Sequence, residues 1–296
     1  PAIIAQAFKD VKPAIVIAVP LVIEKIIRKK VFPQIQNTKV KLLMKMPGVG
    51  KKVKKRICEQ VYQAFGGNLY EVIIGGAALN QEIESFLKDI DFPFTVGYGA
   101  TECAPIITYS DWHDFVPMSC GREVVHMEVK IDSENPETVP GEILARGLNV
   151  MLGYYKNDEA TAQTIDKDGW YHTGDLGLMD KGGNVFIKGR SKNMLLGPNG
   201  QNIYPEEIED KLNSMTFAME SVVVQRDGKL VGLVHPDFDE VLAMGLSRDD
   251  LQSLMEENRV QVNANLPVYC KIAAIEIHDE EFEKTPKKSI KRYLYK

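Results

Sequence analysis

Two short apolar runs, separated by a segment of helical spacing, restrict the fold of this chain more than any other feature. The first run, Tyr70 to Ile74, is halted by Gly75-Gly76, and the second, Phe94 to Val96, is halted by Gly97. Between them Asn80 is a candidate N-cap, followed by apolar residues at helical intervals: Ile83, Phe86, Leu87 and Ile90. A strand, a short helix and a strand of these lengths predict a parallel βαβ unit, and therefore an α/β fold.

The N-terminal segment has a related pattern. Ala14 to Val19 is a continuous β-prone run that ends at Pro20. Apolar residues with helical spacing then follow: Leu21, Val22, Ile26 and Ile27. This pattern predicts a buried strand that leads directly into a helix.

The texture of the sequence changes after Cys120. The apolar segments from His126 to Ile131 and from Glu142 to Ala145 are separated by turn residues, which is typical of antiparallel strands. Residues 180–183, Asp-Lys-Gly-Gly, stand between two further apolar segments and predict a hairpin. We therefore expect a mixed large domain, with a parallel sheet followed by antiparallel strands.

A domain boundary is predicted near Gly189 to Lys192. Residues 1–190 would form the C-terminal part of a large domain, and residues 191–296 a small α/β domain. The small domain is expected to contain a helix from Pro205, a hairpin at Asp227-Gly228, a helix from Asp249 and a strand from Ile272 to Ile277.

Several classes of protein are excluded by composition. With 44% hydrophobic and 26% charged residues the chain is neither fibrous nor wholly disordered. Its longest apolar run, Ala14 to Ile23, is interrupted by Pro20 and is well short of the roughly 20 residues of a membrane helix. The four cysteines are scattered, which suits a reducing cytoplasm.

Positive charge is concentrated at the N-terminal end. Residues 1–56 hold fourteen lysines and arginines against Asp10 and Glu24, although the whole chain has a net charge of −5. The run from Lys51 to Arg56 is either a solvated helix face or a surface for anionic lipid or for the phosphates of an acidic ligand. Nucleic acid is not the expected partner, because the run lacks interleaved aromatic residues.

Two loops at the predicted strand ends are candidates for chemistry, because ligands collect at the carboxyl ends of parallel strands. Gly75-Gly76-Ala77-Ala78 is either a tight strand-to-helix turn or a backbone surface for a planar ring or acyl group. The loop from Gly97 to Glu102 places the Thr101 hydroxyl beside the Glu102 carboxylate. A phosphate oxygen needs such a donor, and a phosphate-bound Mg²⁺ needs such a carboxylate.

Two further groups suggest a sugar site. Asp175 lies between Gly174 and Gly177 in what we expect to be a turn, and its carboxylate could accept both hydroxyls of a ribose. Arg190, at a strand end, could donate to the same sugar. Each group alone is more typical of structural roles. Gly48-Val49-Gly50-Lys51 resembles the end of a phosphate loop but lacks the preceding glycine and the following Ser or Thr.

The order of these motifs resembles the adenylate-forming acyl-CoA synthetases, and most closely the long-chain fatty acid–CoA ligases. The motifs are residues 75–78, 98–102, 173–177, 189–192 and 200–209. The resemblance implies that a carboxylic acid and MgATP form an acyl-adenylate, from which coenzyme A then displaces AMP. ATP or AMP, Mg²⁺ and coenzyme A are therefore the expected cofactor and substrates.

Residue roles follow from the same resemblance. The nucleotide would contact the Gly75 to Ala78 loop, Tyr98 with Gly99, and the Thr101 hydroxyl, while Glu102 would hold Mg²⁺. Asp175 and Arg190 would bind the ribose hydroxyls. Lys192 would be the hinge about which the small domain rotates, and Gly200, Gln201 and Asn202 would face the thiol tunnel.

Two positions depart from the family pattern. No Ser/Thr/Gly-rich phosphate loop occurs in residues 1–296, so we expect it upstream of Pro1 and expect this chain alone to be inactive. At the C-terminus the family has a lysine where this chain has Ser289. Lys287 or Lys288 is predicted to replace it; in a strand, Lys287 would share the face of position 289, about 6–7 Å away.

Other functions stay open at this point. The acceptor could be a carrier-protein thiol, the acid could be medium-chain or aryl, and the protein could be a non-catalytic nucleotide-binding homologue. The expected location is the cytoplasm, with or without peripheral contact to an anionic membrane face. The acyl chain length and the oligomeric state are not determined by these residues.

Overall fold

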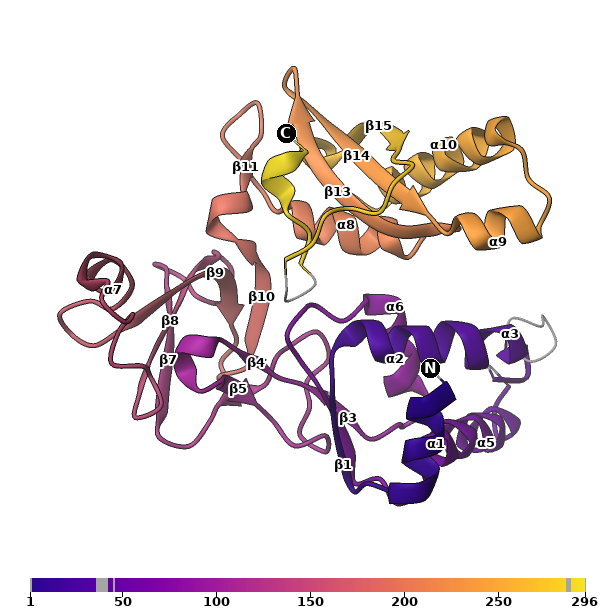
Figure 1. The fold of residues 1–296 in the computed structure, drawn as a ribbon, viewed down its shortest axis with the longest axis horizontal. Coiled ribbons are helices and arrows are strands. Elements are labelled where there is room, and N and C mark those ends of the chain that lie inside the picture. Colours follow the sequence, from indigo (N-terminus) through magenta and orange to yellow (C-terminus); the bar gives the residue numbers. More distant parts are fainter. Residues whose placement is uncertain (1, 36–41, 45, 286–288, 296) are drawn as a thin grey trace. The chain divides into compact units, whose positions relative to one another are not determined.

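The computed structural model describes residues 2–35, 42–44, 46–285 and 289–295 (Figure 1). The chain forms two compact units. Unit 1 comprises Pro1–Val139, Ile143–Thr173 and Leu178–Phe186, and unit 2 comprises Pro140–Glu142, Gly174–Gly177 and Ile187–Lys296. Each unit is described here by itself.

A parallel sheet forms the centre of the N-terminal part of unit 1. Its strands are β1 (Ile15–Ala18), β2 (Glu71–Ile74) and β3 (Phe94–Val96), in the order β1-β2-β3. Ile15 pairs with Glu71, and Val72 pairs with Phe94, both in parallel register. The predicted βαβ unit and the α/β fold class are therefore confirmed.

Helices pack on this sheet and bury most apolar side chains of β2 and β3. They are α1 (Ala2–Val11), α2 (Pro20–Ile26), the π-helix η1 (Ile27–Val31), α3 (Phe32–Ile35), α5 (Val49–Ala64) and α6 (Gln81–Asp89). The core contains Val72, Ile74, Phe94 and, from α6, Ile83 and Leu87.

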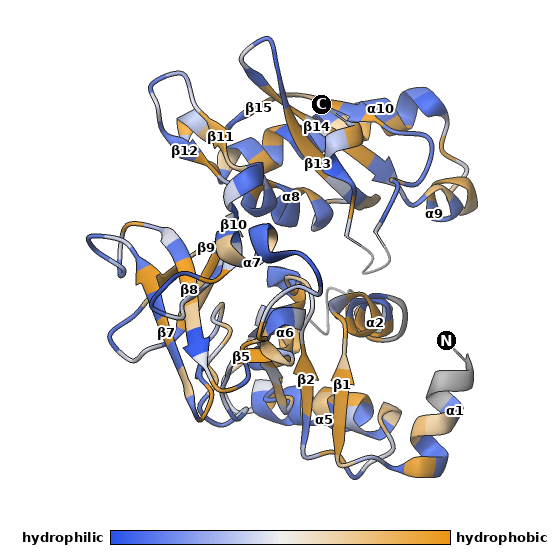
Figure 2. Ribbon diagram, turned by 60° about the vertical axis from the view of Figure 1, so that its left-hand side comes forward, coloured by the Kyte–Doolittle hydropathy of each residue, from blue (hydrophilic) through white to orange (hydrophobic). Residues whose placement is uncertain are grey.

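The hydrophobic strands β1 and β2 stand out in Figure 2. The first strand was predicted to be buried, and this is wrong for half of it: Ile15 and Ile17 are 53% and 79% exposed, because β1 is the edge strand of the sheet.

Two predicted helix starts are confirmed in unit 1. Asn80 caps α6, because its side chain accepts hydrogen bonds from the backbone N–H groups of Glu82 and Ile83. Pro20 occupies the first turn of α2, where a missing N–H costs nothing.

Antiparallel pairing follows the parallel sheet. β4 (Tyr98–Gly99), β5 (Ile106–Tyr109) and β6 (Arg122–Glu123) form a small antiparallel sheet, with the 3₁₀ turn η2 (Thr101–Cys103) between β4 and β5. A second, four-stranded sheet has the order β10-β9-β8-β7, so each strand pairs with the one that follows it along the chain. These strands are β7 (Met127–Asp132), β8 (Gly141–Gly147), β9 (Tyr171–Met179) and β10 (Val185–Arg190).

The four-stranded sheet confirms one prediction and corrects another. The turn at residues 180–183 joins β9 to β10, as the sequence indicates. The turn expected around Asp175 is wrong, because Asp175 lies inside β9. Gly174 has a φ of +69° within this strand, and its N–H donates to the Glu142 carboxylate at 2.9 Å. Because glycine tolerates a positive φ, the backbone can be irregular at Gly174 without ending the strand.

Unit 2 is built on a second three-stranded sheet. β13 (Ala218–Arg226) and β14 (Lys229–Pro236) are antiparallel, and β15 (Ile272–Ile277) joins β14 in parallel. The predicted hairpin at Asp227-Gly228 is confirmed, and both of its turn residues have positive φ. The sheet packs with helices α8 (Pro205–Asn213) and α10 (Arg248–Ala264). Ser247 caps the N-terminus of α10.

The remaining elements are short. They are α7 (Asp158–Thr164), η3 (Ser191–Asn193), β11 (Leu195–Leu196), β12 (Asn202–Ile203), α9 (Phe238–Ala243), η4 (Val268–Cys270) and η5 (Arg292–Leu294). Among the described residues, none of the helices combines the length and the apolar composition needed to cross a bilayer.

Candidate functional site

The two glycine-containing loops of unit 1 leave the same edge of the parallel sheet. The Gly75 N–H donates to the carbonyl of Ala18 at 3.1 Å, and the Gly97 N–H donates to the carbonyl of Ile74 at 2.9 Å. A Cβ on Gly75 would lie 3.2 Å from the Gly97 carbonyl oxygen. The loop from Gly75 to Ala78 therefore starts beside the segment that leads to Tyr98. The structure brings these two predicted motifs together.

Backbone contacts hold the turn that carries Thr101 and Glu102. The Ala100 N–H donates to the Pro105 carbonyl at 2.8 Å, and the Met151 N–H donates to the Glu102 carbonyl at 2.7 Å. Gly99 is needed here, because a Cβ would lie 2.0 Å from the Pro105 oxygen. The turn leaves the Thr101 side chain exposed to solvent and that of Glu102 half-buried.

Hydroxyl groups surround the Glu102 carboxylate. The Tyr154 hydroxyl donates to Oε1 of Glu102 at 2.9 Å, and Tyr171 is a second hydrogen-bonding partner. Burial, with Glu102 nearby, raises the pKa of Tyr154 and of Tyr171, and raises the pKa of Cys103 to about 11. All three groups are therefore neutral at pH 7. The two tyrosine hydroxyls orient the carboxylate, and none of the three groups brings a charge of its own.

This arrangement fits a magnesium ligand. Mg²⁺ in nucleotide sites is held by one or two carboxylates together with substrate phosphates and water, rather than by an all-protein cage. Among the described residues, no group of three or more His, Cys, Asp or Glu side chains could hold a metal by itself. A single half-buried glutamate beside an exposed threonine hydroxyl has the donor set for a phosphate-bound Mg²⁺.

Tyr98, a predicted contact of the nucleotide, has a buried side chain. Its side chain is 8% exposed and belongs to a hydrophobic cluster with Cys103, Ile107 and Tyr171. Packing therefore fixes the position of the Tyr98 ring within unit 1.

Asp175 and Arg190 meet in unit 2. Nε of Arg190 lies 2.8 Å from Oδ1 of Asp175; the Asp175 side chain is 10% exposed and that of Arg190 is 53% exposed. The sequence analysis assigned both residues to one sugar, and the structure brings them together. A carboxylate beside a guanidinium offers adjacent acceptor and donor atoms, which matches the hydroxyls of a ribose.

The predicted hinge lies directly after this pair. Lys192 is exposed in η3, and the side-chain amide of the neighbouring Asn193 donates to Oε1 of Glu206 at 2.7 Å. Gly189 approaches the same glutamate, since a Cβ at this position would lie 2.6 Å from Oε2 of Glu206. The segment before α8 is therefore tied to the first turn of that helix.

The predicted thiol loop forms the tip of the β11–β12 hairpin. Gly200 has a φ of +78°, and a Cβ there would meet nothing within 4 Å. Asn202 is exposed, while Oε1 of Gln201 is buried and has no hydrogen-bond partner among the described residues.

The C-terminal segment is described up to Thr285 and again from Ser289. The Thr285 N–H donates to the Ser289 carbonyl at 2.8 Å, and Lys284 pairs with Ile290 as an antiparallel bridge. The predicted catalytic residues Lys287 and Lys288 lie outside the described residues. Downstream, Arg292 forms an ion pair with the buried Glu209 of α8.

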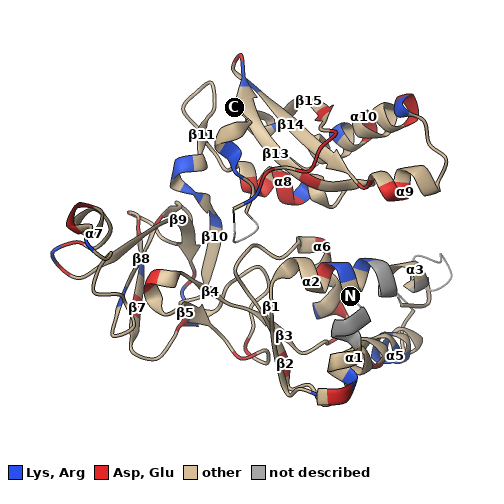
Figure 3. Ribbon diagram, in the orientation of Figure 1, with Lys and Arg blue, Asp and Glu red and all other residues tan. Residues whose placement is uncertain are grey.

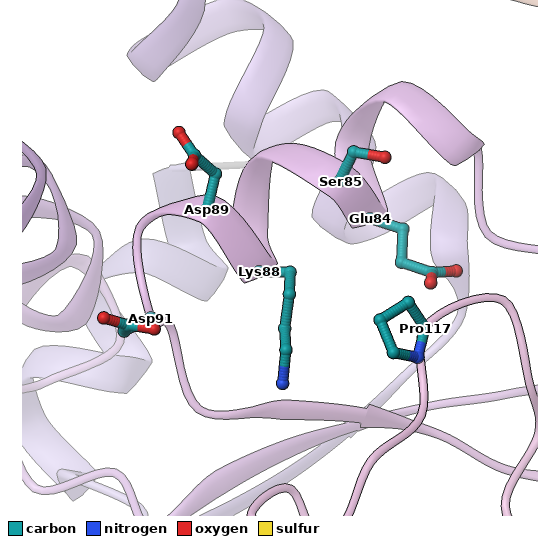
Figure 4. A pocket seen from close by; sticks show the side chains of 6 residues that line it. All are labelled: Glu84, Ser85, Lys88, Asp89, Asp91 and Pro117. Atoms are coloured by element: carbon teal, nitrogen blue, oxygen red, sulfur yellow. The ribbon is translucent and has the colours of Figure 1, made fainter. Parts of the chain in front are cut away.

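A pocket of about 480 Å³ lies elsewhere in unit 1, at the C-terminal end of α6 (Figure 4). Its lining residues are Glu84, Ser85, Lys88, Asp89, Asp91 and Pro117. None of the residues that the sequence analysis singled out lines it, and all but Glu84 are exposed. We assign no part of the predicted chemistry to this pocket.

Sequence reasoning missed Tyr154 and Tyr171 as partners of Glu102. Tyr154 follows Gly153 in an irregular segment 52 positions from Glu102, and no motif spacing links the two. Tyr171 lies two residues before Thr173, on the same face of β9. The alternating pattern of β9 indicates that Tyr171 is buried, but it does not indicate which group the Tyr171 hydroxyl contacts.

Comparisons with known proteins agree with the family that the sequence resembles. A family model described as AMP-binding enzyme matches residues 1–155. Long-chain-fatty-acid–CoA ligase of Escherichia coli O6:H1 is 37% identical over 178 residues, which is 58% of this chain and 28% of that protein. 4-Coumarate–CoA ligase 1 of Glycine max is 38% identical over 173 residues, which is 54% of this chain and 58% of that protein.

The fold is also similar to that of solved structures. O-succinylbenzoate coenzyme A synthetase of Bacillus subtilis, solved in complex with AMP, superposes with a TM-score of 0.72 at 19% identity. That comparison covers 100% of this chain and 53% of the other. The chain thus spans less than two thirds of the length of each of these three proteins.

Proposed function

The chain belongs to the AMP-binding enzyme family, and from this premise we propose that the protein is an acid–thiol ligase that forms an acyl-adenylate. In the first step a carboxylate oxygen attacks the α-phosphorus of ATP, and pyrophosphate leaves. In the second step the thiolate of coenzyme A attacks the acyl carbonyl, and AMP leaves. The motif order of the chain and the family match support this reaction.

The observation that carries the proposal is the arrangement around Glu102. The Thr101 hydroxyl would donate to an α-phosphate oxygen, and the Glu102 carboxylate would hold Mg²⁺, which offsets the charge of the phosphates. Tyr154 donates to Glu102 and therefore acts as a positioning residue. The Gly75 to Ala78 loop, with Tyr98 and Gly99, would border the adenine.

The sugar contact uses Asp175 and Arg190. Asp175 would accept hydrogen bonds from the ribose hydroxyls, and Arg190, which is half exposed, would donate to the same sugar. Their existing ion pair orients both side chains before the nucleotide arrives, which lowers the entropy lost on binding.

The remaining roles are proposed from the motif positions. Lys192 would serve as the hinge between the two half-reactions, and Gly200, Gln201 and Asn202 would face the thiol. Lys287 or Lys288 would approach the α-phosphate in place of the lysine that the family has at the position of Ser289. Such a charge-assisted contact contributes about 1.5–3 kcal/mol.

We propose a long-chain fatty acid as the substrate and the cytoplasm as the location. The identity to a long-chain-fatty-acid–CoA ligase supports the acid, and four free cysteines suit a reducing compartment. The identity to a 4-coumarate–CoA ligase makes an aryl acid the second candidate. Transfer to a carrier-protein thiol and a non-catalytic nucleotide-binding role are the further alternatives.

ATP–pyrophosphate exchange tests the reaction and the acid together. In the intact enzyme we expect Mg²⁺-dependent exchange with oleate that exceeds exchange with 4-coumarate by about tenfold or more, followed by thioester formation with coenzyme A. Faster exchange with 4-coumarate would overturn the fatty-acid assignment. No exchange with any carboxylate, together with retained AMP binding, would identify a non-catalytic homologue.

A further inference from the structure

Four cations lie on one face of the first half of α5. They are Lys51, Lys52, Lys55 and Arg56, and all four are exposed. Figure 3 shows the blue of lysine and arginine along α5. The opposite face packs into the core through Ile57 and Val61, which are 7% and 2% exposed. Residues three and four positions apart share a helix face, so these cations form one continuous basic strip.

The four cations differ from their neighbour Lys54 in their ion pairing. Nζ of Lys54 lies 2.5 Å from Oδ1 of Asp89. Within the part of the chain that the structure describes, no carboxylate forms an ion pair with any of the four. An acidic residue in the first turn would stabilise the N-terminus of a helix, and the first turn of α5 has none.

An apolar turn adjoins the basic strip. Leu42, Leu43, Met46 and Val49 are 64%, 38%, 44% and 41% exposed, within eight residues of chain. The Met46 N–H donates to the Leu43 carbonyl at 3.2 Å, and the Gly50 N–H donates to the Met46 carbonyl at 2.8 Å. This turn therefore runs directly into the first turn of α5.

Glycine makes this junction tight. A Cβ on Gly50 would lie 2.3 Å from the carbonyl oxygen of Met44, so a side chain at this position would separate the turn from the helix. Val49 starts the helix, one turn before Lys52 and two turns before Arg56. The apolar side chains and the cations consequently share one surface.

We propose that this surface, formed by Leu42, Leu43, Met46, Val49, Lys51, Lys52, Lys55 and Arg56, docks onto a bilayer that contains anionic lipids. Exposed leucine and methionine side chains gain by entering the boundary between head groups and acyl chains, and cations beside them gain from anionic head groups. Neither term alone gives stable attachment, whereas the two together do.

Charge complementarity selects this occupant. A second copy of the chain would bring the same four cations to the contact, and like charges oppose that pairing. Nucleic acid would favour aromatic side chains among the cations, and the strip has none. The proposal is independent of which acid the enzyme activates.

Vesicle co-sedimentation of the chain tests the proposal. We expect binding to phosphatidylcholine vesicles with 30% phosphatidylglycerol and little binding to pure phosphatidylcholine. Since each cation near an anionic surface contributes roughly fivefold, the variant K51Q/K52Q/K55Q/R56Q should bind on the order of 600-fold more weakly. The variant L42Q/L43Q/M46Q should lose about tenfold while keeping every charge.

A matched control separates the surface from net charge. The variant K167Q/K181Q/K229Q/K271Q removes four exposed lysines elsewhere and should bind within a fewfold of the parent. Equal losses in the two quadruple variants would overturn the proposal, as would equal binding to both vesicle types. Competition by glycerol phosphate or by a DNA duplex at the ionic strength of the vesicle buffer would also overturn it, by identifying a soluble anion as the ligand.

Discussion

The turn that carries Glu102 and the strand that carries Asp175 surround their carboxylates with different chemistry. Glu102 accepts a hydrogen bond from the neutral hydroxyl of Tyr154, beside the protonated Tyr171 and Cys103. Asp175 lies 2.8 Å from the guanidinium of Arg190. Hydroxyl partners orient a carboxylate and leave its charge for a cation. A guanidinium offsets the negative charge of the carboxylate beside it. The lone pairs of the carboxylate that the guanidinium does not use are then suited to neutral hydroxyl donors.

This difference supports the two separate roles that we propose for these acids. An acid held by hydroxyls is suited to a metal ion, and an acid held by a guanidinium is suited to a sugar. Both motifs contain a single acid near glycine or threonine. The sequence of each motif therefore does not indicate whether its acid lies beside hydroxyl groups or beside a guanidinium.

Glu102→Gln should give the largest effect. The amide keeps the shape of the side chain and its capacity to accept from Tyr154, but it removes the charge that would hold Mg²⁺. We expect acyl-adenylate formation in the intact enzyme to slow by about 10²–10³-fold, with a higher Mg²⁺ concentration needed for half-maximal rate.

Rapid-quench measurement of acyl-adenylate over a Mg²⁺ titration checks this prediction. Glu134→Gln removes an exposed carboxylate of the same unit and serves as the control. Tyr154→Phe should slow the step by only about 2- to 10-fold, because it removes one hydrogen bond and leaves the charge. A parent rate in Glu102→Gln at low Mg²⁺ would remove this residue from the metal site.

Asp175→Asn should have a smaller effect that does not depend on Mg²⁺. Loss of a charged acceptor for the ribose hydroxyls should weaken AMP binding by about 10- to 100-fold. Arg190 is half exposed, so solvent can satisfy its guanidinium after the substitution.

Calorimetry with AMP and with 2′,3′-dideoxy-AMP measures the sugar contact directly. The parent should prefer AMP, and Asp175→Asn should lose most of that preference, whereas the exposed strand variant Asp132→Asn should keep it. If Asp175→Asn still discriminates fully between the two nucleotides, the ribose contact lies elsewhere.

A third acid extends the comparison to stability. Glu209 lies beside Arg292, as Asp175 lies beside Arg190, but Glu209 is buried and also accepts from the Val223 N–H at 2.6 Å. Burial outweighs the guanidinium and raises the pKa of Glu209 to about 7. The folded state therefore binds a proton between about pH 4.5 and 7 that the unfolded chain has released.

Because of this proton, the free energy of unfolding of unit 2 should fall as pH rises from about 5 to 7, by up to about 1 kcal/mol per pH unit, and then level off. Hydrogen exchange of the β13 amides at several pH values, corrected for intrinsic exchange, measures this slope. Glu209→Gln should flatten it, and the exposed control Glu257→Gln should not. A slope of the opposite sign would mean that Arg292 dominates and holds Glu209 ionised.

Much of the fold was predictable because its signals are local. Asn80 caps α6 through the N–H groups of residues two and three positions ahead, and Asp227-Gly228 supply the two positive φ values of a tight hairpin. Each signal involves residues within one turn of the chain. The order of the motifs was equally readable, because it depends on sequence position alone.

The strand around Asp175 was not predictable in this way. Its glycines indicate a turn, but the β8 residue Glu142, 32 positions earlier, accepts the Gly174 N–H and allows the strand to continue. Pairing with a distant strand overrode the local preference.

The sequence by itself determined the α/β class, the order of the motifs and which side chains carry hydroxyl, carboxylate and guanidinium groups. Tertiary structure decided the partners of those groups. Tyr154 reaches Glu102 across 52 positions, and Arg292 reaches Glu209 across 83. A carboxylate's proton affinity depends on burial and on charges within a few ångströms, and packing sets both by bringing together residues that are remote in sequence.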